Sequence, residues 1–373
     1  MAIVRLRDYF IDAVLPVWAS VAFDDHAGQF MEGLQLDGSP DPSGIVRTRT
    51  AARIIYVFAQ ASSLGVAPDR ALEKAERAFA NLRKVAWIGG DRPGYARTID
   101  YKTGVVTDSE RDLYDHACVL LALAWLLKAT GKSEYLLQIE ELVAAMDLTL
   151  AAPHGGWAED SIGSLPRRQN PHMHYFEACL ALWEVGAGER YAARAGELFG
   201  FFRTRLFDDG AGVLREFFGP AWELAAEYNS SRLDPGHMSE WVWLVRRYDK
   251  LAGADHSDLC HKLLDAALRL GAADNTPFLV DETALDGKPL RHTRRLWLQA
   301  ELLKAYIMQA RATGDEAYSR KANALVEALF ATYLADTPPG TWRDCFDREG
   351  RCVATSIPGS SLYHLWSGVA ELV

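Results

Sequence analysis

Polar residues recur along this chain about every sixty residues, each near the start of a predicted helix. Steps of 63, 58 and 63 residues separate Arg53, His116, His174 and His237. A further 127 residues, about two periods, lead from there to His364. The segment 295–301 lies midway along that last stretch. The repeat lies in spacing rather than in identical sequence, which indicates a repeated structural unit.

Apolar residues recur at helical spacing through most of the chain, which predicts roughly twelve helices and very few strands. We expect helices near 4–22, 46–64, 68–86, 112–130, 133–150, 171–186, 189–206, 237–252, 255–272, 293–313, 315–335 and 361–371. Each period holds one helix pair. Closing six such hairpins in a ring gives an all-α (α/α)6 barrel, with alternate helices inside and their starts at one rim.

Short connections containing glycine and aromatic residues join several helix pairs, at 93–106, 210–218 and 341–353. The last predicts a β-hairpin with its turn at 347–350. No linker or shift in composition divides the chain, so we expect one domain over 1–373.

The net charge of −10 argues against nucleic acid or an anionic membrane as the main partner, because both attract clustered Lys and Arg. No dense basic run appears, and the pairs at 167–168 and 294–295 are isolated. The most apolar stretch, 117–127, is about half the ~20 residues that span a bilayer. Five cysteines without C-x-x-C spacing suggest neither disulfides nor zinc. We expect a cytoplasmic protein without membrane or nucleic-acid partners.

Four segments carry residues suited to chemistry: R-Q-N-P-H-M-H-Y-F-E-A (168–178), D-P-G-H-M-S-E-W-V-W-L (234–244), R-R-L-W-L-Q-A-E (294–301) and S-S-L-Y-H-L-W (360–366). The first and second each contain H-x-x-E, which places a histidine and a glutamate on one helix face. The third puts an aromatic ring and a carboxylate four residues apart.

Each feature has a simpler interpretation. A single histidine near a helix start can be a capping or packing residue, and H-x-x-E can be a structural ion pair. His172 and His174 could hold a metal, but residues two apart on a helix point in different directions, and no third ligand has the usual spacing. We therefore expect no metal and no cofactor.

The recurrence of histidine, arginine and glutamate at alternate helix starts favours proton transfer on a neutral sugar. Imidazoles can move protons, carboxylates can orient them, an arginine can stabilise an enediolate, and tryptophan can face a sugar ring. Six helix starts at one mouth would favour anionic intermediates and lower the pKa of nearby histidines. No serine or cysteine nucleophile arrangement is evident.

The motifs N-P-H-M-H-x-x-E-A, D-P-G-H-x-x-E-W-x-W-L and R-x-W-x-Q-A-E resemble those of the N-acylglucosamine 2-epimerase superfamily. Its members include mannose isomerases, the aldose–ketose isomerase of sulfoquinovose metabolism and cellobiose 2-epimerases. The resemblance spans about 47–364 and is strongest to the mannose isomerase branch. The family fold is the (α/α)6 barrel. One departure is Leu298, where proline is common in the family, and the chain is shorter than many relatives.

The resemblance implies roles for several residues. His364 would remove the C2 proton of an open-chain aldose and return it to C1. His237 would be the second acid–base group, assisting ring opening or transfer between O1 and O2. Arg53, in A-A-R-I-I-Y-V-F-A, would bind the oxygen of the cis-enediolate.

Other residues would bind or orient the sugar. His174 would orient it, and Trp297 would line its site. Glu240 and Glu301 would orient histidines or hold hydroxyl groups. His116, in L-Y-D-H-A, is a further binding candidate.

The expected activity is interconversion of D-mannose and D-fructose, with D-lyxose and D-xylulose as a further pair, in a monomer or homodimer. A sugar 2-epimerase using the same histidines stays open. A glycoside hydrolase would need paired catalytic carboxylates, and a non-catalytic sugar-binding protein is a further alternative. The lack of a clustered basic site favours a free sugar over a phosphorylated one.

Overall fold

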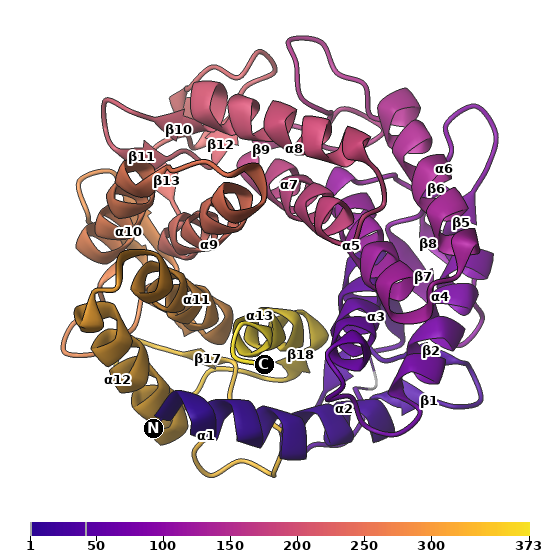
Figure 1. The fold of residues 1–373 in the computed structure, drawn as a ribbon, viewed down its shortest axis with the longest axis horizontal. Coiled ribbons are helices and arrows are strands. Elements are labelled where there is room, and N and C mark those ends of the chain that lie inside the picture. Colours follow the sequence, from indigo (N-terminus) through magenta and orange to yellow (C-terminus); the bar gives the residue numbers. More distant parts are fainter. Residues whose placement is uncertain (1, 42) are drawn as a thin grey trace.

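The computed structural model describes residues 2–41 and 43–373, and the chain is mostly helical, as predicted. Two concentric rings of helices surround a central axis (Figure 1). In the described residues the inner ring comprises α3 (Thr48–Ser63), α5 (Leu113–Thr130), α7 (Gln169–Glu184), α9 (Pro235–Ala252), α11 (Leu296–Thr313) and α13 (Gly359–Ala370). The outer ring comprises α1 (Ala2–Tyr9), α2 (Leu15–Ser20), α4 (Ala71–Ala86), α6 (Ser133–Thr149), α8 (Glu189–Phe201), α10 (Ser257–Gly271) and α12 (Glu316–Thr332).

Contacts between neighbouring helices close the inner ring. Each inner helix packs on the next, and α13 returns to pack on α3. In the outer ring the first helix, α1, packs on α12, whereas the last helix, α13, lies in the inner ring (Figure 1). All inner helices therefore start at the same end of the molecule.

Capping residues fix where several inner helices begin and end. The side chain of Asp112 accepts from the backbone N–H of Tyr114 at the start of α5, and Asp234 does the same for Gly236 in α9. Both helices end at a glycine in the left-handed region, at Gly131 (φ 68°) and Gly253 (φ 64°).

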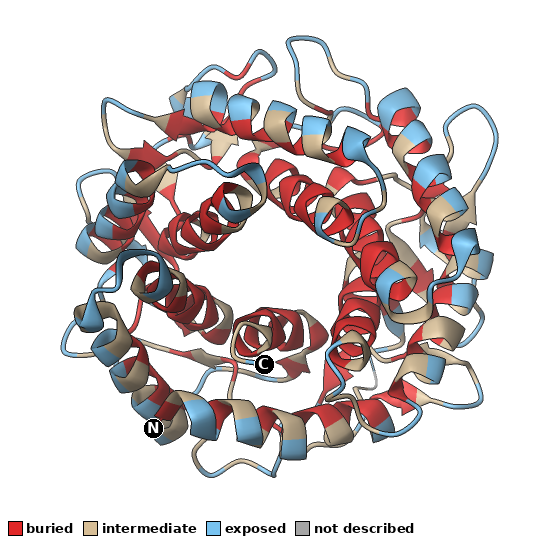
Figure 2. Ribbon diagram, in the orientation of Figure 1, coloured by how far each residue is buried: buried red, intermediate tan, exposed pale blue. Residues whose placement is uncertain are grey.

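Burial separates the two rings. The inner helices are buried on nearly all sides, whereas the outer helices bury one stripe and expose the other (Figure 2). One helix, α5, is long and apolar enough to cross a membrane, but 72% of that window is buried inside the fold. The burial identifies α5 as a core helix of the inner ring.

Short antiparallel strands connect the helices. The pairs and triplets are β1 (Phe23–Asp24) with β2 (Gln29–Phe30); β3 (Gly33–Leu34) with β18 (Ile357–Pro358); β4 (Ile45–Arg47) with β7 (Thr98–Asp100) and β8 (Val106–Asp108); β5 (Trp87–Ile88) with β6 (Gly94–Tyr95); β9 (Arg167–Arg168) with β12 (Phe217–Phe218); β10 (Phe207–Asp208) with β11 (Val213–Leu214); β13 (Arg232–Leu233) with β14 (Glu282–Ala284) and β15 (Pro289–Arg291); and β16 (Arg294–Arg295) with β17 (Cys345–Phe346). Strands β4, β9, β16 and β18 lead directly into inner helices. The strands thus fix the helix starts.

Helix bounds differ from prediction at a few points. The predicted helix 4–22 is interrupted by a π-turn at Phe10–Val14. Helix α11 starts at Leu296 rather than 293, because Arg294 and Arg295 pair with β17. The predicted hairpin turn is confirmed, since Gly350 N–H donates to the Asp347 carbonyl and Phe346 bridges to Cys352.

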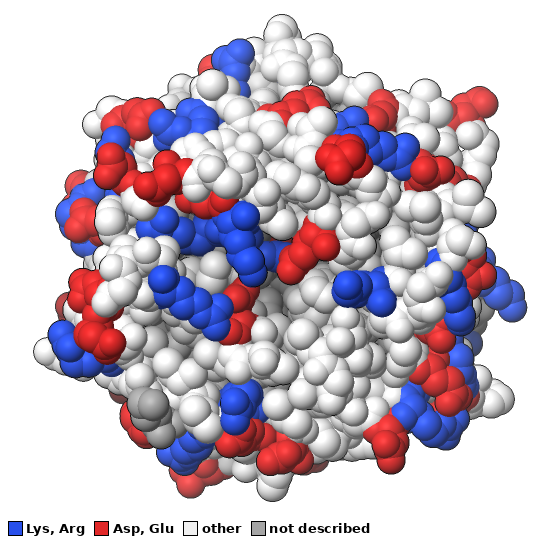
Figure 3. All heavy atoms as spheres, in the orientation of Figure 1, with Lys and Arg blue, Asp and Glu red and all other residues white. Residues whose placement is uncertain are grey.

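A cavity of about 710 Å³ lies where the inner helices end. Figure 3 shows a hollow with mixed acidic and basic side chains around it. The lining arginines are paired, Arg247 with Glu184 and Arg311 with Glu371. Cations near helix C-termini are favoured by the helix dipole, which accounts for their placement.

A substitution in the strand pair that links the first and last inner helices tests the ring closure. A Cβ at Gly33 would clash with the backbone oxygen of Ile357, so Gly33→Ala should lower the free energy of unfolding by about 1–3 kcal/mol. Gly89→Ala, where a Cβ meets nothing within 4 Å, should change it by less than about 0.5 kcal/mol. Denaturant unfolding of both variants measures the difference, and equal stabilities would contradict the packing described.

Candidate active site

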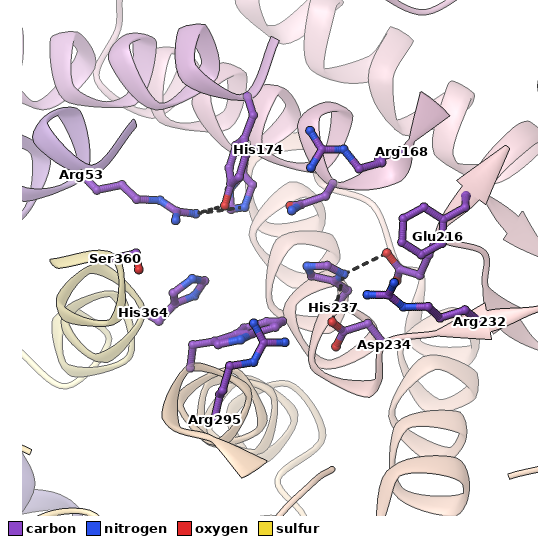
Figure 4. Close-up of a pocket in the computed structure, with 14 residues that line it drawn as sticks. Arg53, Arg168, His174, Glu216, Arg232, Asp234, His237, Arg295, Ser360 and His364 are labelled. Atoms are coloured by element: carbon purple, nitrogen blue, oxygen red, sulfur yellow. Dashed lines mark hydrogen bonds and ion pairs between the residues drawn. The ribbon is translucent and has the colours of Figure 1, made fainter. Parts of the chain in front are cut away.

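A pocket of about 400 Å³ lies at the end of the molecule where the inner helices start. Side chains from all six inner helices and from the connecting strands converge on it (Figure 4). Its lining residues are Arg53, Tyr114, Arg168, Asn170, His174, Glu216, Phe217, Arg232, Asp234, His237, Arg295, Trp297, Ser360 and His364.

His237 and His364 lie on either side of one indole ring. The centroid of Trp297 is 5.1 Å from that of His237 and 5.2 Å from that of His364. Two histidines 127 residues apart in sequence therefore face the same pocket. A volume of this size accommodates one monosaccharide.

A buried carboxylate holds the His364 ring. Its Nδ1 lies 2.6 Å from Glu301 Oε1, so Nε2 is the ring nitrogen that this carboxylate does not hold. Burial, with the Arg53 and Lys304 cations, lowers the pKa of His364 well below its usual value. Burial and Glu240 raise the pKa of Glu301, whereas the Lys304 ammonium, 2.7 Å away, opposes that rise. His364 is therefore a neutral imidazole near pH 7.

His237 has the opposite charge state. Its Nδ1 donates to Glu216 Oε2 at 3.0 Å and lies 3.8 Å from Asp234 Oδ2. Burial by itself would lower the pKa of His237, but the carboxylates of Glu216 and Asp234 outweigh burial and raise this pKa to about 10. The expectation that helix starts would lower histidine pKa values is thus wrong for His237. Local carboxylates outweigh the helix dipole, so His237 is an imidazolium at neutral pH.

The tautomer of His174 follows from its partners. Arg53 can only donate, so at 3.2 Å the Nε2 of His174 must accept from it. The proton then sits on Nδ1, which donates to Glu177 at 2.9 Å. Burial lowers the pKa of His174, consistent with a neutral ring. Arg53 also donates to the Tyr114 hydroxyl at 2.6 Å.

A layer of fully buried polar groups underlies the pocket. Glu240, Glu301, Lys304 and Tyr363 each have 0% exposure. Neither carboxylate oxygen of Glu240 has a hydrogen-bond partner in the described residues. Among the residues that the structure describes, Glu240 does not pair with His237, as the H-x-x-E spacing suggested, because His237 turns to Glu216 and Asp234 instead.

Two groups of side chains in this layer could hold a metal ion. They are His174–Glu177–Glu240 and Glu240–Glu301–His364, with ligand atoms within 4.8 Å of one another. Sequence spacing did not reveal them, because their members come from different helices. One carboxylate in each group already has a partner within the protein. Tyr363 donates to Glu177 at 2.6 Å, and Lys304 forms an ion pair with Glu301.

The chain matches the family model described as N-acylglucosamine 2-epimerase (GlcNAc 2-epimerase) over residues 28–368. The chain belongs to this family. It is 31% identical to the mannose-6-phosphate isomerase of Rhizobium meliloti (strain 1021), covering 99% of this chain and 96% of that one. Identity to the D-mannose isomerase of Thermobifida fusca is 28%, covering 87% and 83%. Identity to a cellobiose 2-epimerase of Ruminococcus albus (strain ATCC 27210 / DSM 20455 / JCM 14654 / NCDO 2250 / 7) is 24%, covering 92% and 90%.

A crystal structure of a D-mannose isomerase superposes with a TM-score of 0.88 at 22% identity, over 99% of this chain and 97% of that one. The family and its relatives identify the chain as an enzyme, a sugar isomerase or epimerase.

His116, predicted from the sequence to be a sugar-binding candidate, lies outside the pocket. His116 is buried between α5 and β6, where its Nε2 accepts from the backbone N–H of Tyr95 at 3.0 Å. Its Nδ1 lies 2.6 Å from the Asp112 carbonyl. Both ring nitrogens are thus used within the fold, and His116 does not line the pocket. The shared spacing reflects a common position on a helix, not a common direction.

Sequence reasoning missed several lining residues. Arg168, Glu216, Arg232, Asp234 and Arg295 reach the pocket from short strands or helix caps. Such segments have no periodic signal. Their arginines correct the earlier inference that a clustered basic site is lacking, because residues far apart in sequence meet at one mouth.

The charge of His237 can be tested directly. Glu216→Gln removes a carboxylate that favours the imidazolium, so the pKa of His237 should fall from about 10 by about one to three pH units. Titration of histidine ring resonances by NMR measures it. Glu134→Gln, on the outer helix α6, should leave the titration unchanged. A His237 that is neutral at pH 7 in the unsubstituted protein would contradict the assignment.

Proposed function

We propose that the protein is an aldose–ketose isomerase that interconverts D-mannose and D-fructose, with D-lyxose and D-xylulose as a further pair, by metal-independent histidine acid–base catalysis. The supporting observation is that a neutral His364 and a cationic His237 flank Trp297 in one sugar-sized pocket. The names of two relatives, both isomerases of a mannose skeleton, support this substrate. We also propose that the two helix rings form one (α/α)6-barrel domain.

In the proposed reaction Nε2 of His364 removes the C2 proton of the open-chain aldose. The C–H electron pair forms the C1–C2 double bond, and O1 becomes the enediolate oxygen. His237 moves a proton between O2 and O1, and His364 returns its proton to C1, which gives the ketose. A neutral base and a cationic acid at neutral pH suit these two roles.

Arg53 and His174 complete the proposed site. The Arg53 guanidinium, 3.2 Å from His174, supplies donors for the enediolate oxygen. Trp297 offers an apolar face for the sugar carbons. Glu301 orients His364. Glu240 lies beneath the pocket, with carboxylate oxygens within 4.8 Å of a ring nitrogen of His174 and of one of His364.

A sugar 2-epimerase is the alternative, because a cellobiose 2-epimerase is among the relatives and a third imidazole, His174, also lines the pocket. Return of the proton to the opposite face of C2 would then replace delivery to C1. A glycoside hydrolase is disfavoured, since the two lining carboxylates, Glu216 and Asp234, both lie beside His237 on one side (Figure 4).

Incubation with mannose, glucose and lyxose in deuterated water separates these reactions. The isomerase should yield ketose with deuterium at C1, detected by NMR and mass spectrometry. A C2 epimer with deuterium at C2 would instead establish the epimerase. The same yield with EDTA is expected, and loss of turnover with the chelator would overturn the metal-free mechanism.

His364→Asn should lower proton exchange by about 100- to 10,000-fold, the range for loss of a general base. A matched control is His256→Asn, since His256 forms a similar histidine–aspartate pair, 2.5 Å from Asp249, at the opposite end of the inner ring. That control should exchange protons at the unsubstituted rate. Substantial exchange by the His364 variant, with its circular dichroism unchanged, would mean that another group is the base.

A further inference from the structure

Three arginines meet at the mouth of the pocket. Arg168 ends β9, Arg232 starts β13, and Arg295 ends β16. Their side chains are 34%, 40% and 36% exposed, so each guanidinium is reachable from solvent. We call these three residues the arginine cluster.

A buried carboxylate holds each member from behind. Arg168 pairs with Glu159, Arg232 with Glu282 at 2.7 Å, and Arg295 with Asp281 at 2.9 Å. The three carboxylates are 6%, 7% and 1% exposed. These pairs fix the direction of each guanidinium without closing it off from the pocket.

The pairs leave donors unused. A guanidinium carries five N–H groups. In residues 2–41 and 43–373, no acceptor is found for either terminal nitrogen of Arg295, and Arg232 donates through one nitrogen only. The lining acids have other partners, since Glu216 Oε2 accepts from His237 and Asp234 Oδ1 caps α9. Several planar donors of pocket-lining arginines are therefore without a protein acceptor in the described part of the chain.

Two members of the cluster, Arg168 and Arg232, lie across the pocket from His364, on the side of His237, whereas Arg295 lies between the two sides (Figure 4). Arg53 and Ser360 lie on the same side as His364. A hexose with C1 and C2 against His364 would extend its other end towards the arginines. Arginine forks suit the tetrahedral oxygens of a phosphate, and the converging helix starts add positive potential.

We propose that the arginine cluster binds a phosphate group on the end of the sugar remote from C1 and C2, so that the preferred substrate is a phosphorylated aldose such as mannose 6-phosphate. This inference rests on the proposed function, because it places the reacting carbons at His364. It extends the proposed function from mannose to its phosphate ester, and it differs from the free sugar that the sequence favoured.

Calorimetric binding and turnover test the two proposals separately. The protein should bind mannose 6-phosphate more tightly than mannose, and inorganic phosphate should compete with the former. The dissociation constant for mannose divided by that for mannose 6-phosphate measures the preference for the phosphate. In Arg232→Gln this ratio should fall by roughly 10- to 100-fold, as expected for lost charge-assisted hydrogen bonds.

Arg291→Gln is the matched control. Arg291 contacts the same Glu282, at 3.3 Å, but is 55% exposed and does not line the pocket. In the Arg291 variant the ratio of the two dissociation constants should stay within about twofold of the value for the unsubstituted protein, as for an exposed ion pair. Equal affinity for the two sugars, or equal effects of the two substitutions, would overturn the phosphate subsite. Tight phosphate-dependent binding without proton exchange would instead sustain the subsite and refute the isomerase.

Discussion

Closure of the inner ring by α13 on α3 is the constraint on which the site depends. Arg53 lies on α3 and His364 on α13, near opposite ends of the sequence, and both line one pocket. The strand pair β3–β18 and the bond from Gly359 N–H to the Glu32 carbonyl, 2.9 Å, align the two helix starts. Since all inner helices start at one end, each hairpin can contribute a side chain to the same space.

Within that space, three imidazoles take different charge states because their surroundings differ. Glu301, Glu216 and Glu177 each contact one histidine ring through Nδ1. At His237 the carboxylate of Asp234, 3.8 Å away, adds to that of Glu216, and of the three rings His237 alone has a raised pKa. Different environments for like groups are how a protein prepares an acid and a base at one pH.

The helix number and the alternation of helices were predictable because apolar periodicity and caps are local signals. His174, His237 and Trp297 were predictable as pocket residues because they lie near inner-helix starts. Glu216 and Arg232 were not, since they lie on or beside two-residue strands whose direction depends on distant partners. His116 had the right spacing but turns towards β6, and spacing carries no information on side-chain direction. The charge of His237 depends on Glu216, 21 residues earlier in sequence.

The buried layer beneath the pocket separates it from the cavity at the other end of the inner helices, because the two share no lining residue. Glu301, Lys304 and Tyr363 in this layer are fully buried, and Lys304 Nζ lies 3.7 Å from the ring centroid of Trp243. A sugar that enters by the mouth must also leave by it, and two sugars cannot pass each other inside. Incoming and outgoing molecules would therefore exclude one another, and net flux would depend on how quickly the product is carried away outside.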